Sequence, residues 1–256
     1  MMMVAAQTAF GAMAIHFEDD RILGWATGWS SFQRGPVTIA EPDGPLASWG
    51  SPSDALYMSD VKINDVLAVV SLGDGGSITL TFDQPIGDGP GSDLAVFENG
   101  FKDERPGMGG FDYLELAFVE VSSDGTTFHR FPAISLTQTT TQVPFGGTLD
   151  GTKLENLAGK YVREYGTPFD LAELAGIEGL NIAAITHVRI VDVVGCIDPA
   201  YGSMDSLGNL INDPWETPFE TGGFDLDAVA VLNLPEPTAP LFCLLGAAML
   251  GFRRRR

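Results

Sequence analysis

Short apolar runs separated by turn-forming residues dominate this sequence and restrict the folds that it can adopt. Glycine occurs 31 times and proline 16 times in 256 residues, and they interrupt the apolar runs at frequent intervals. Short runs rich in Val, Ile, Leu and Phe, bounded by Gly, Asp or Pro, are typical of strands in β-sandwiches. The pattern predicts an all-β fold, with strands expected at 66–71, 77–82, 94–98, 113–122, 128–131, 187–194 and 224–232.

Two turns and one helical segment have local signals of their own. Asp74-Gly75-Gly76 and Asp124-Gly125 lie between strand-like runs, and glycine supplies the positive φ that a tight hairpin requires. Helical pattern is scarce, and its best case is segment 170–175, where Asp170 is placed to cap a short helix. No internal repeat of fixed period is visible, which argues against propellers and solenoids.

The charge balance excludes one class of partner. The chain carries 34 acidic and 14 basic residues, for a net charge of -20. The bases before the C-terminus are scattered singly and form no basic stripe, so nucleic-acid binding is not expected. Hydrophobic residues make up 45% of the chain, enough to bury a core, so intrinsic disorder is not expected either.

The N-terminal segment 1–14 has features of a signal peptide. It is uncharged and apolar, and it closes on Ala12-Met13-Ala14, with small residues at the positions that a signal peptidase inspects. The positively charged start is missing, so we interpret the segment as a signal peptide shortened by a late start codon. The alternative is an ordinary apolar strand. On the first interpretation the protein is exported, and its body is a β-sandwich domain over residues 15–234.

The C-terminal segment 235–256 has three parts in a fixed order. Pro235-Glu236-Pro237 comes first, then the charge-free segment 238–252, and then the four arginines Arg253, Arg254, Arg255 and Arg256. A helix over 238–252 spans about 22 Å, against roughly 30 Å of bilayer hydrocarbon, so it predicts a short, marginal transmembrane helix. Arginines directly after a span stay cytoplasmic, which places the body outside the inner membrane. A buried hydrophobic helix would not explain the arginine cluster.

These three parts resemble the PEP-CTERM sorting signal of Gram-negative bacteria. Pro235, Glu236 and Pro237 match the signature tripeptide, and the short span and the terminal arginines match the rest of the signal. The resemblance implies recognition by an exosortase, a membrane cysteine peptidase. Such an enzyme would process the tail near Pro235 and release or transfer the body to the cell surface. The resemblance says nothing about the activity of the body.

Several motifs of the body carry a second resemblance, in order along the chain. SSDGTTF at 122–128 resembles a hairpin of discoidin-type galactose-binding jelly rolls, and GGFDLDAV at 222–229 resembles the closing strand of exported jelly-roll proteins. Three further segments are similar to parts of uncharacterised bacterial cell-surface proteins, namely GDGGSI at 73–78, FENG at 97–100 and GTPFDL at 166–171. The resemblance implies a galactose-binding-like jelly-roll β-sandwich and no assigned activity.

Acidic residues on apolar strand faces predict a calcium site. Alternate strand residues share a face, so Glu98, Glu120 and Asp192 lie on faces that are otherwise apolar. A carboxylate removed from water costs several kcal/mol unless it is paired, protonated or bound to a metal. Calcium takes about six to eight oxygen ligands. The candidate ligands are Asp93, Glu98, Asn99, Asp225 and Asp227, with the loop 205–213 as a further source. The alternative is that these acids meet water or Arg189.

Sugar recognition uses exposed aromatic side chains with a few polar partners. Trp25, Trp29, Trp49 and Trp215 are the candidates. We select Trp215, flanked by two prolines and two acids, and Trp49, in a Gly/Ser-rich region. The alternative is that these tryptophans cover the edge of the core. No Gly-x-Ser-x-Gly elbow is present, and we assign no catalytic residue.

The sequence therefore predicts an exported, exosortase-sorted and non-catalytic cell-surface or extracellular-matrix protein. Its acidic β-sandwich is expected to bind calcium and a carbohydrate such as an extracellular polysaccharide. The alternative is a secreted glycan-active hydrolase, because two carboxylates suffice for glycoside hydrolysis. A shallow groove with an exposed tryptophan would favour the binding protein, whereas two carboxylates facing each other in a cleft would favour the enzyme.

Overall fold

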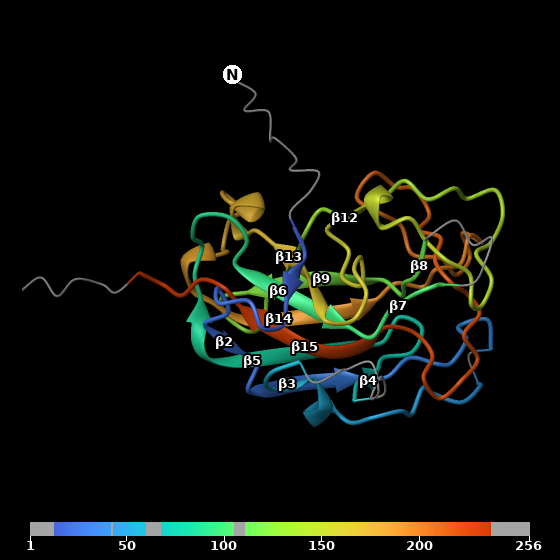
Figure 1. Cartoon of the computed structure of the whole chain (residues 1–256), viewed down its shortest axis with the longest axis horizontal. Coiled ribbons are helices and arrows are strands. Elements are labelled where there is room, and N and C mark those ends of the chain that lie inside the picture. Colours follow the sequence, from blue (N-terminus) through green and yellow to red (C-terminus); the bar gives the residue numbers. More distant parts are fainter. Residues whose placement is uncertain (1–12, 42, 60–67, 105–110, 237–256) are drawn as a thin grey trace, which may run out of the picture.

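The computed structural model describes residues 13–41, 43–59, 68–104 and 111–236, and these form strands joined by loops and short 3-10 turns (Figure 1). The longer strands are β3 (Gly28–Gln33), β5 (Ser77–Ile86), β6 (Leu94–Glu98), β9 (Ala117–Ser122), β13 (Tyr165–Phe169), β14 (Ile185–Asp192) and β15 (Asp225–Val231). The short strands are β1 (Ile15–His16), β2 (Gly24–Trp25), β4 (Val70–Ser71), β7 (Phe101–Lys102), β8 (Asp112–Tyr113), β10 (His129–Arg130), β11 (Ile134–Ser135) and β12 (Leu154–Glu155). The predicted all-β class is confirmed.

Two main antiparallel sheets contain most of these strands. The first has the order β1-β13-β6-β15-β2, and β4 also pairs with β15. The second has the order β10-β9-β14-β5-β3. Two small two-stranded sheets, β7 with β8 and β11 with β12, lie outside them.

The two main sheets share one hydrophobic core. Val96 and Val229 of the first sheet belong to the same buried cluster as Leu80 and Val188 of the second. The apolar alternation of the strands produces this core, because each strand turns every second side chain toward the other sheet. The arrangement is β-sandwich-like, in agreement with the expected class.

The first sheet is covered on its other face as well. Phe97 of β6 and Ala228 of β15 belong to a separate buried cluster, against which Phe17, Ile22 and Trp25 from the N-terminal segment pack. The rings of Trp25 and Phe97 lie 5.3 Å apart. Strands β6 and β15 are therefore buried on both faces, which explains why every residue of both is buried.

The expected strand 113–122 is divided in two. Strand β8 ends at Tyr113 and pairs with β7, whereas β9 begins at Ala117 and joins the second sheet. Leu114 and Leu116 between them pack into a further buried cluster beneath the long loops. In contrast, the expected strand 94–98 coincides with β6.

One predicted turn is a hairpin and the other is not. Asp124-Gly125 joins β9 and β10, which pair antiparallel, and Gly125 has a φ of 75°. Gly75 also has a positive φ, of 70°, but β4 before it and β5 after it belong to different sheets. The Asp74-Gly75 turn therefore carries the chain from one sheet to the other, because turn chemistry determines φ and not the partner of the next strand.

The expected helical segment at 170–175 is a single 3-10 turn, η3 (Leu171–Leu174). The carboxylate of Asp170 caps it by accepting a hydrogen bond of 2.9 Å from the backbone N–H of Ala172. The other 3-10 turns are η1 (Pro52–Ala55), η2 (Gly151–Lys153) and η4 (Ile182–Ala184).

No helix among the described residues is long and apolar enough to cross a membrane. The expected transmembrane segment 238–252, with Pro237 and the four terminal arginines, lies outside the described residues, as do residues 1–12 of the expected signal peptide.

Candidate functional site

The expectation that acids lie on apolar faces is confirmed: twelve carboxyl side chains are buried among the residues that the structure describes. Glu98, Glu120 and Asp192, the three singled out by strand alternation, are 2%, 7% and 3% exposed. The others are Asp74, Asp93, Asp103, Glu115, Glu155, Asp205, Asp213, Asp225 and Asp227. Their partners separate those with a structural role from those that are available to a ligand.

Glu120 has a structural role, because it is paired with two arginines. It lies on β9 between Arg130 of β10 and Arg189 of β14, directly across from both. Its carboxylate oxygens are 2.8 Å from Arg130 Nη2 and 2.6 Å from Arg189 Nε. The guanidinium groups in turn lie 3.9 Å and 4.0 Å from the ring centroids of Phe118 and Phe128. The alternative that an acid meets Arg189 is therefore correct for Glu120.

Asp192 and Asp213 also serve the fold. Asp192 accepts hydrogen bonds from the backbone N–H groups of Gly75, at 2.8 Å, and Phe224, at 2.7 Å. Asp213 accepts one from the N–H of Leu116, at 3.1 Å. Burial raises the pKa of both carboxyl groups well above the usual range. These residues tie loops to strands and satisfy backbone donors that would otherwise be buried without partners.

Four of the five predicted metal ligands lie near one another, around the C-terminal end of β6 and the start of β15. Asn99 Nδ2 donates a hydrogen bond of 3.0 Å to Asp225, which also accepts from the hydroxyl of Ser71. Asp227 accepts a hydrogen bond from the hydroxyl of Ser59. Burial first, and then the charges of Asp225 and Asp227, raise the pKa of Glu98 well above its usual range.

One oxygen of the Glu98 carboxyl group is hydrogen-bonded and the other is not. Its Oε2 accepts a hydrogen bond of 2.7 Å from the N–H of Gly100, whereas its buried Oε1 has no hydrogen-bond partner. The site residues at this end are thus brought together, and their role as metal ligands stays a prediction.

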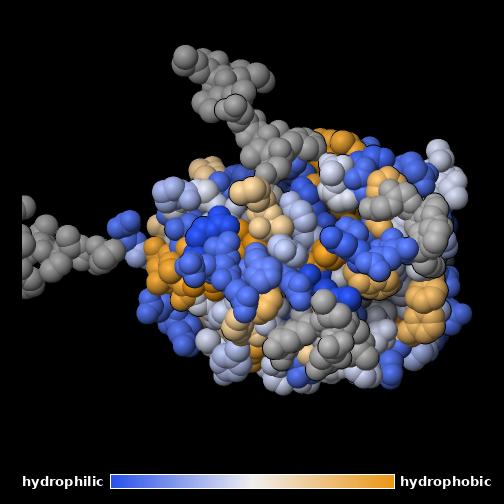
Figure 2. Space-filling view, viewed as in Figure 1, coloured by the Kyte–Doolittle hydropathy of each residue, from blue (hydrophilic) through white to orange (hydrophobic). Residues whose placement is uncertain are grey.

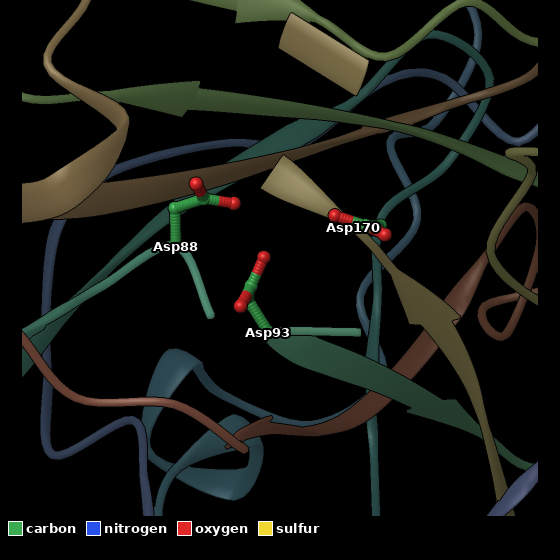
Figure 3. Close-up of side chains that lie close together, drawn as sticks. All are labelled: Asp88, Asp93 and Asp170. Atoms are coloured by element: carbon green, nitrogen blue, oxygen red, sulfur yellow. The ribbon is translucent and has the colours of Figure 1, made fainter. Parts of the chain in front are cut away.

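Asp93, the fifth predicted ligand, lies at the opposite end of β6. Asp93 and Glu98 are five positions apart along extended chain, a distance of about 16 Å, so the two cannot bind one ion. Asp93 instead lies beside Asp88, in the segment after β5, and Asp170, at the end of β13 (Figure 3). Oxygen atoms of these three carboxylates all lie within 4.8 Å of one another, so the group can hold a metal ion.

The side chain of Asp93 is fixed in place at this acidic group. It accepts hydrogen bonds from the backbone N–H groups of Gly89 and Leu171, at 2.8 Å and 2.7 Å, and from Asn233 Nδ2 at 2.9 Å. Burial raises its pKa to about 6, although these bonds act in the opposite direction. Asp88 is exposed and Asp170 is half-buried, so the group opens to solvent.

A pocket of about 250 Å³ lies beside the C-terminal end of β6. Half-buried Asn99 and the buried acids Glu115 and Asp225 line it, together with two aromatic pairs, Phe101 with Tyr113 and Phe145 with Phe219. Gly146, Arg163, Thr217 and Thr221 complete the lining. We call it the acidic pocket. Figure 2 shows hydrophobic patches among hydrophilic residues at this end of the molecule, around β7 and β8.

The two carboxyl groups of the acidic pocket influence each other. Burial first, and then the charges of Asp225 and Glu98, raise the pKa of Glu115 well above its usual range. Burial raises the pKa of Asp225 to about 7. The hydroxyl of Tyr113 is hydrogen-bonded to Glu115, which places the tyrosine ring against the acid. At neutral pH the pocket therefore has two carboxyl groups that a positively charged or hydrogen-bonding ligand can reach.

A second, shallow hollow adjoins the acidic pocket. It is lined by Trp215 with Gln142, Pro144, Glu216 and Pro218, and it shares Phe145 and Phe219 with the pocket. Trp215 is half-buried, not fully exposed as its flanking residues suggest, because its indole N–H donates a hydrogen bond of 3.0 Å to Asp74. Trp49 is also half-buried and lines neither hollow, so the structure separates the two predicted sugar-binding tryptophans.

Sequence reasoning missed several residues of both sites. Tyr113 and Glu115 are two apart in an apolar run, a spacing that can place a polar pair on one side of the chain. Asp170 was expected only as a helix cap, a role that it does have. Phe145 and Phe219 have no local signal, because both lie in Pro/Gly-rich loops without a strand or helix pattern.

In comparisons with known proteins, no family model matches this chain and no curated protein matches it.

Proposed function

We propose that this chain is an exported, non-catalytic cell-surface protein that binds carbohydrate in the acidic pocket and the adjoining hollow. The observation that carries this proposal is the pocket itself, where aromatic rings and buried polar groups line one cavity. Sugar rings have apolar faces that stack on aromatic rings, and their hydroxyl groups need polar partners at the edges. The proposal includes a galactose-binding-like jelly-roll class for the β-sandwich.

The extended aromatic surface supports a ligand longer than one sugar. Phe145 and Phe219 lie 4.8 Å apart and line both hollows, so a chain molecule can pass from the acidic pocket across these rings to Trp215. Phe145 and Phe219 are 58% and 44% exposed. Exposed aromatic residues gathered at two hollows are more typical of a binding surface than of a closed coat.

Calcium is the cation that we propose for Asp88, Asp93 and Asp170. These residues supply carboxylate oxygens, which calcium prefers. No basic residue is among the groups that shift the pKa of Asp93 most strongly, so a bound cation would balance the charge of the carboxylates. The ion would join the segment after β5, the start of β6 and the end of β13. Its proposed role is to stabilise this end of the sandwich, opposite the acidic pocket.

The route to the surface rests on the two ends of the sequence. We propose that the signal peptide exports the chain and that exosortase recognises the tail from Pro235 onward, with the apolar segment held in the inner membrane until processing. The mature protein would then stay at the cell surface or in the matrix, with polysaccharide as its partner.

A glycan-active hydrolase is the second candidate, and one observation favours it. Glu115 and Asp225 line the same pocket, and burial raises the pKa of Asp225 to about 7, which fits a group that holds and releases a proton near neutral pH. Burial and the charge of Asp225 raise the pKa of Glu115 as well. On this reading Asp225→Asn abolishes release of reducing sugar from a glycan and leaves binding intact. If the wild-type chain releases none from any bound glycan, the hydrolase candidate is wrong.

The binding proposal is tested with the full-length chain in mild detergent and a panel of immobilised polysaccharides. Phe219→Ala should lose binding, because this ring lines both hollows. Tyr201→Ala is the matched control, since Tyr201 is 41% exposed, close to the 44% of Phe219, and lines neither hollow. If the Phe219→Ala and control variants are retained equally on every glycan that the wild type binds, the acidic pocket and the adjoining hollow are not the binding site.

A further inference from the structure

The chemistry of the acidic pocket selects among carbohydrates. Glu115 and Asp225 are 6% and 4% exposed, so they lie at its base, and Asn99 holds Asp225 by a hydrogen bond of 3.0 Å. The charges that act most strongly on Glu115 are those of Asp225, Glu98, Asp213 and Asp192, all of them acidic. A cation that reaches this base therefore meets acidic groups, and its charge would favour their ionised forms.

Aromatic rings also line the same pocket, and those of Phe101, Phe145 and Phe219 are exposed. Phe101 and Tyr113 are stacked, with ring centroids 4.9 Å apart and an angle of 13° between the planes, and Phe145 lies 4.8 Å from Phe219. Aromatic faces attract cations, most strongly organic ammonium groups that are removed from water. Exposed rings and buried carboxyl groups in one pocket are two independent features that favour the same kind of ligand.

The remaining charges agree with this preference. Arg163 is the one basic residue among the lining residues that the structure describes, so a pocket with both carboxyl groups ionised still has an excess of negative charge. The whole chain has a net charge of -20. Such a field draws polycations toward the protein and repels acidic polymers.

We propose that the acidic pocket binds the free ammonium group of an amino sugar within a glycan chain. This inference rests on the proposed carbohydrate-binding function and names the class of sugar. The ammonium group would lie at the base, where Glu115 and Asp225 accept its hydrogen bonds, and the sugar ring would stack on the aromatic pairs. A bare metal ion is a poorer occupant, because aromatic rings supply no oxygen ligands.

The test compares two oligosaccharides of equal length by isothermal titration calorimetry on the full-length chain in detergent with EDTA. One is an oligomer of glucosamine and the other an oligomer of N-acetylglucosamine, whose acetyl groups remove the charge. The glucosamine oligomer should bind at least about tenfold more tightly, since a charge-assisted hydrogen bond and a cation–π contact are lost in the other.

Variants locate the effect in the pocket. Glu115→Gln and Asp225→Asn keep the shape of the side chain and should each weaken binding of the glucosamine oligomer by about tenfold. Glu178→Gln removes the same charge from an exposed position between η3 and η4 and should bind as the wild type does. Circular dichroism checks that each variant is folded, and Phe101→Leu is a second variant that tests the aromatic lining without changing charge.

The outcomes are distinguishable. Equal affinity for the two oligomers overturns the amino-sugar inference and leaves carbohydrate binding standing. Binding of neither oligomer overturns the inference, while the polysaccharide panel with Phe219→Ala still decides the proposed function. Equally tight binding of an oligolysine with the same number of charges also overturns it, because the pocket would then recognise an ammonium group without its sugar.

Discussion

The buried carboxyl group of Asp225 should make the domain less stable at alkaline pH, and Asp225→Asn should remove part of that loss. Burial raises the pKa of Asp225 to about 7 in the folded chain, from 3.8 for an exposed aspartate. A carboxyl group with a raised folded pKa contributes stability that is fully present below its unfolded pKa and is lost as the pH rises through its folded pKa. For Asp225 this window runs from about pH 4 to about pH 7.

The size of the effect follows from the difference between the two pKa values. Each pKa unit corresponds to about 1.36 kcal/mol, so ionisation of Asp225 lowers the free energy of unfolding by about 4 kcal/mol between these limits. The charge of Asp225 also raises the pKa values of Glu98 and Glu115, and therefore the neutral variant relieves both neighbours. At pH 8 we expect Asp225→Asn to melt about 10 °C above the wild type.

The assay is thermal melting in EDTA at pH 4 and pH 8, followed by tryptophan fluorescence. The stability difference between Asp225→Asn and wild type should increase with pH, and Asp43→Asn, a change at an exposed aspartate, should show no such trend. If the melting temperature of the Asp225→Asn chain falls as steeply with pH as that of the wild type, the reasoning is refuted, because the loss of stability would then come from other groups.

Three further predictions test other parts of the molecule. Millimolar calcium should raise the stability above that in EDTA by about 2.7 kcal/mol at a hundredfold excess over Kd, and Asp88→Asn should abolish the shift in melting temperature; a shift that persists would place the ion elsewhere. Glu120→Ala should lower the free energy of unfolding by about 2 kcal/mol, less than for a fully buried pair because both arginines are partly exposed, and an unchanged urea midpoint would contradict the structural role of Glu120. Deletion of 235–256 should leave soluble protein in the periplasm, whereas continued surface display would show that the tail is not the sorting signal.

Strand positions were predictable because they depend on local alternation. β6 coincides with the expected run, since an apolar segment between polar turns leaves few other choices. The division of 113–122 was not predictable, because it depends on β8 pairing with β7 while β9 joins the second sheet. The Asp74-Gly75 turn is a second example. The positive φ of Gly75 was predicted correctly, but the sheet that the next strand joins was not.

The group of Asp88, Asp93 and Asp170, which can hold a metal ion, shows what the sequence could not predict. Asp93 was expected to share an ion with Glu98 because both flank one strand, yet an extended strand places its two ends far apart. Asp88 and Asp170 approach Asp93 from different elements. Only the order of β13 beside β6 brings Asp170 to this position, and that order is a property of the sheet as a whole.

The sequence by itself determined that this chain forms strands and that some carboxyl groups must leave water, because alternation places Glu98, Glu120 and Asp192 among apolar residues. The tertiary structure decided what each acid meets. Glu120 lies between two arginines, and Glu115 lies beside Asp225 in a pocket lined with aromatic rings. The physical reason is that the partners come from distant strands and loops, so that sheet order and register, which no local pattern encodes, decide which charges become neighbours.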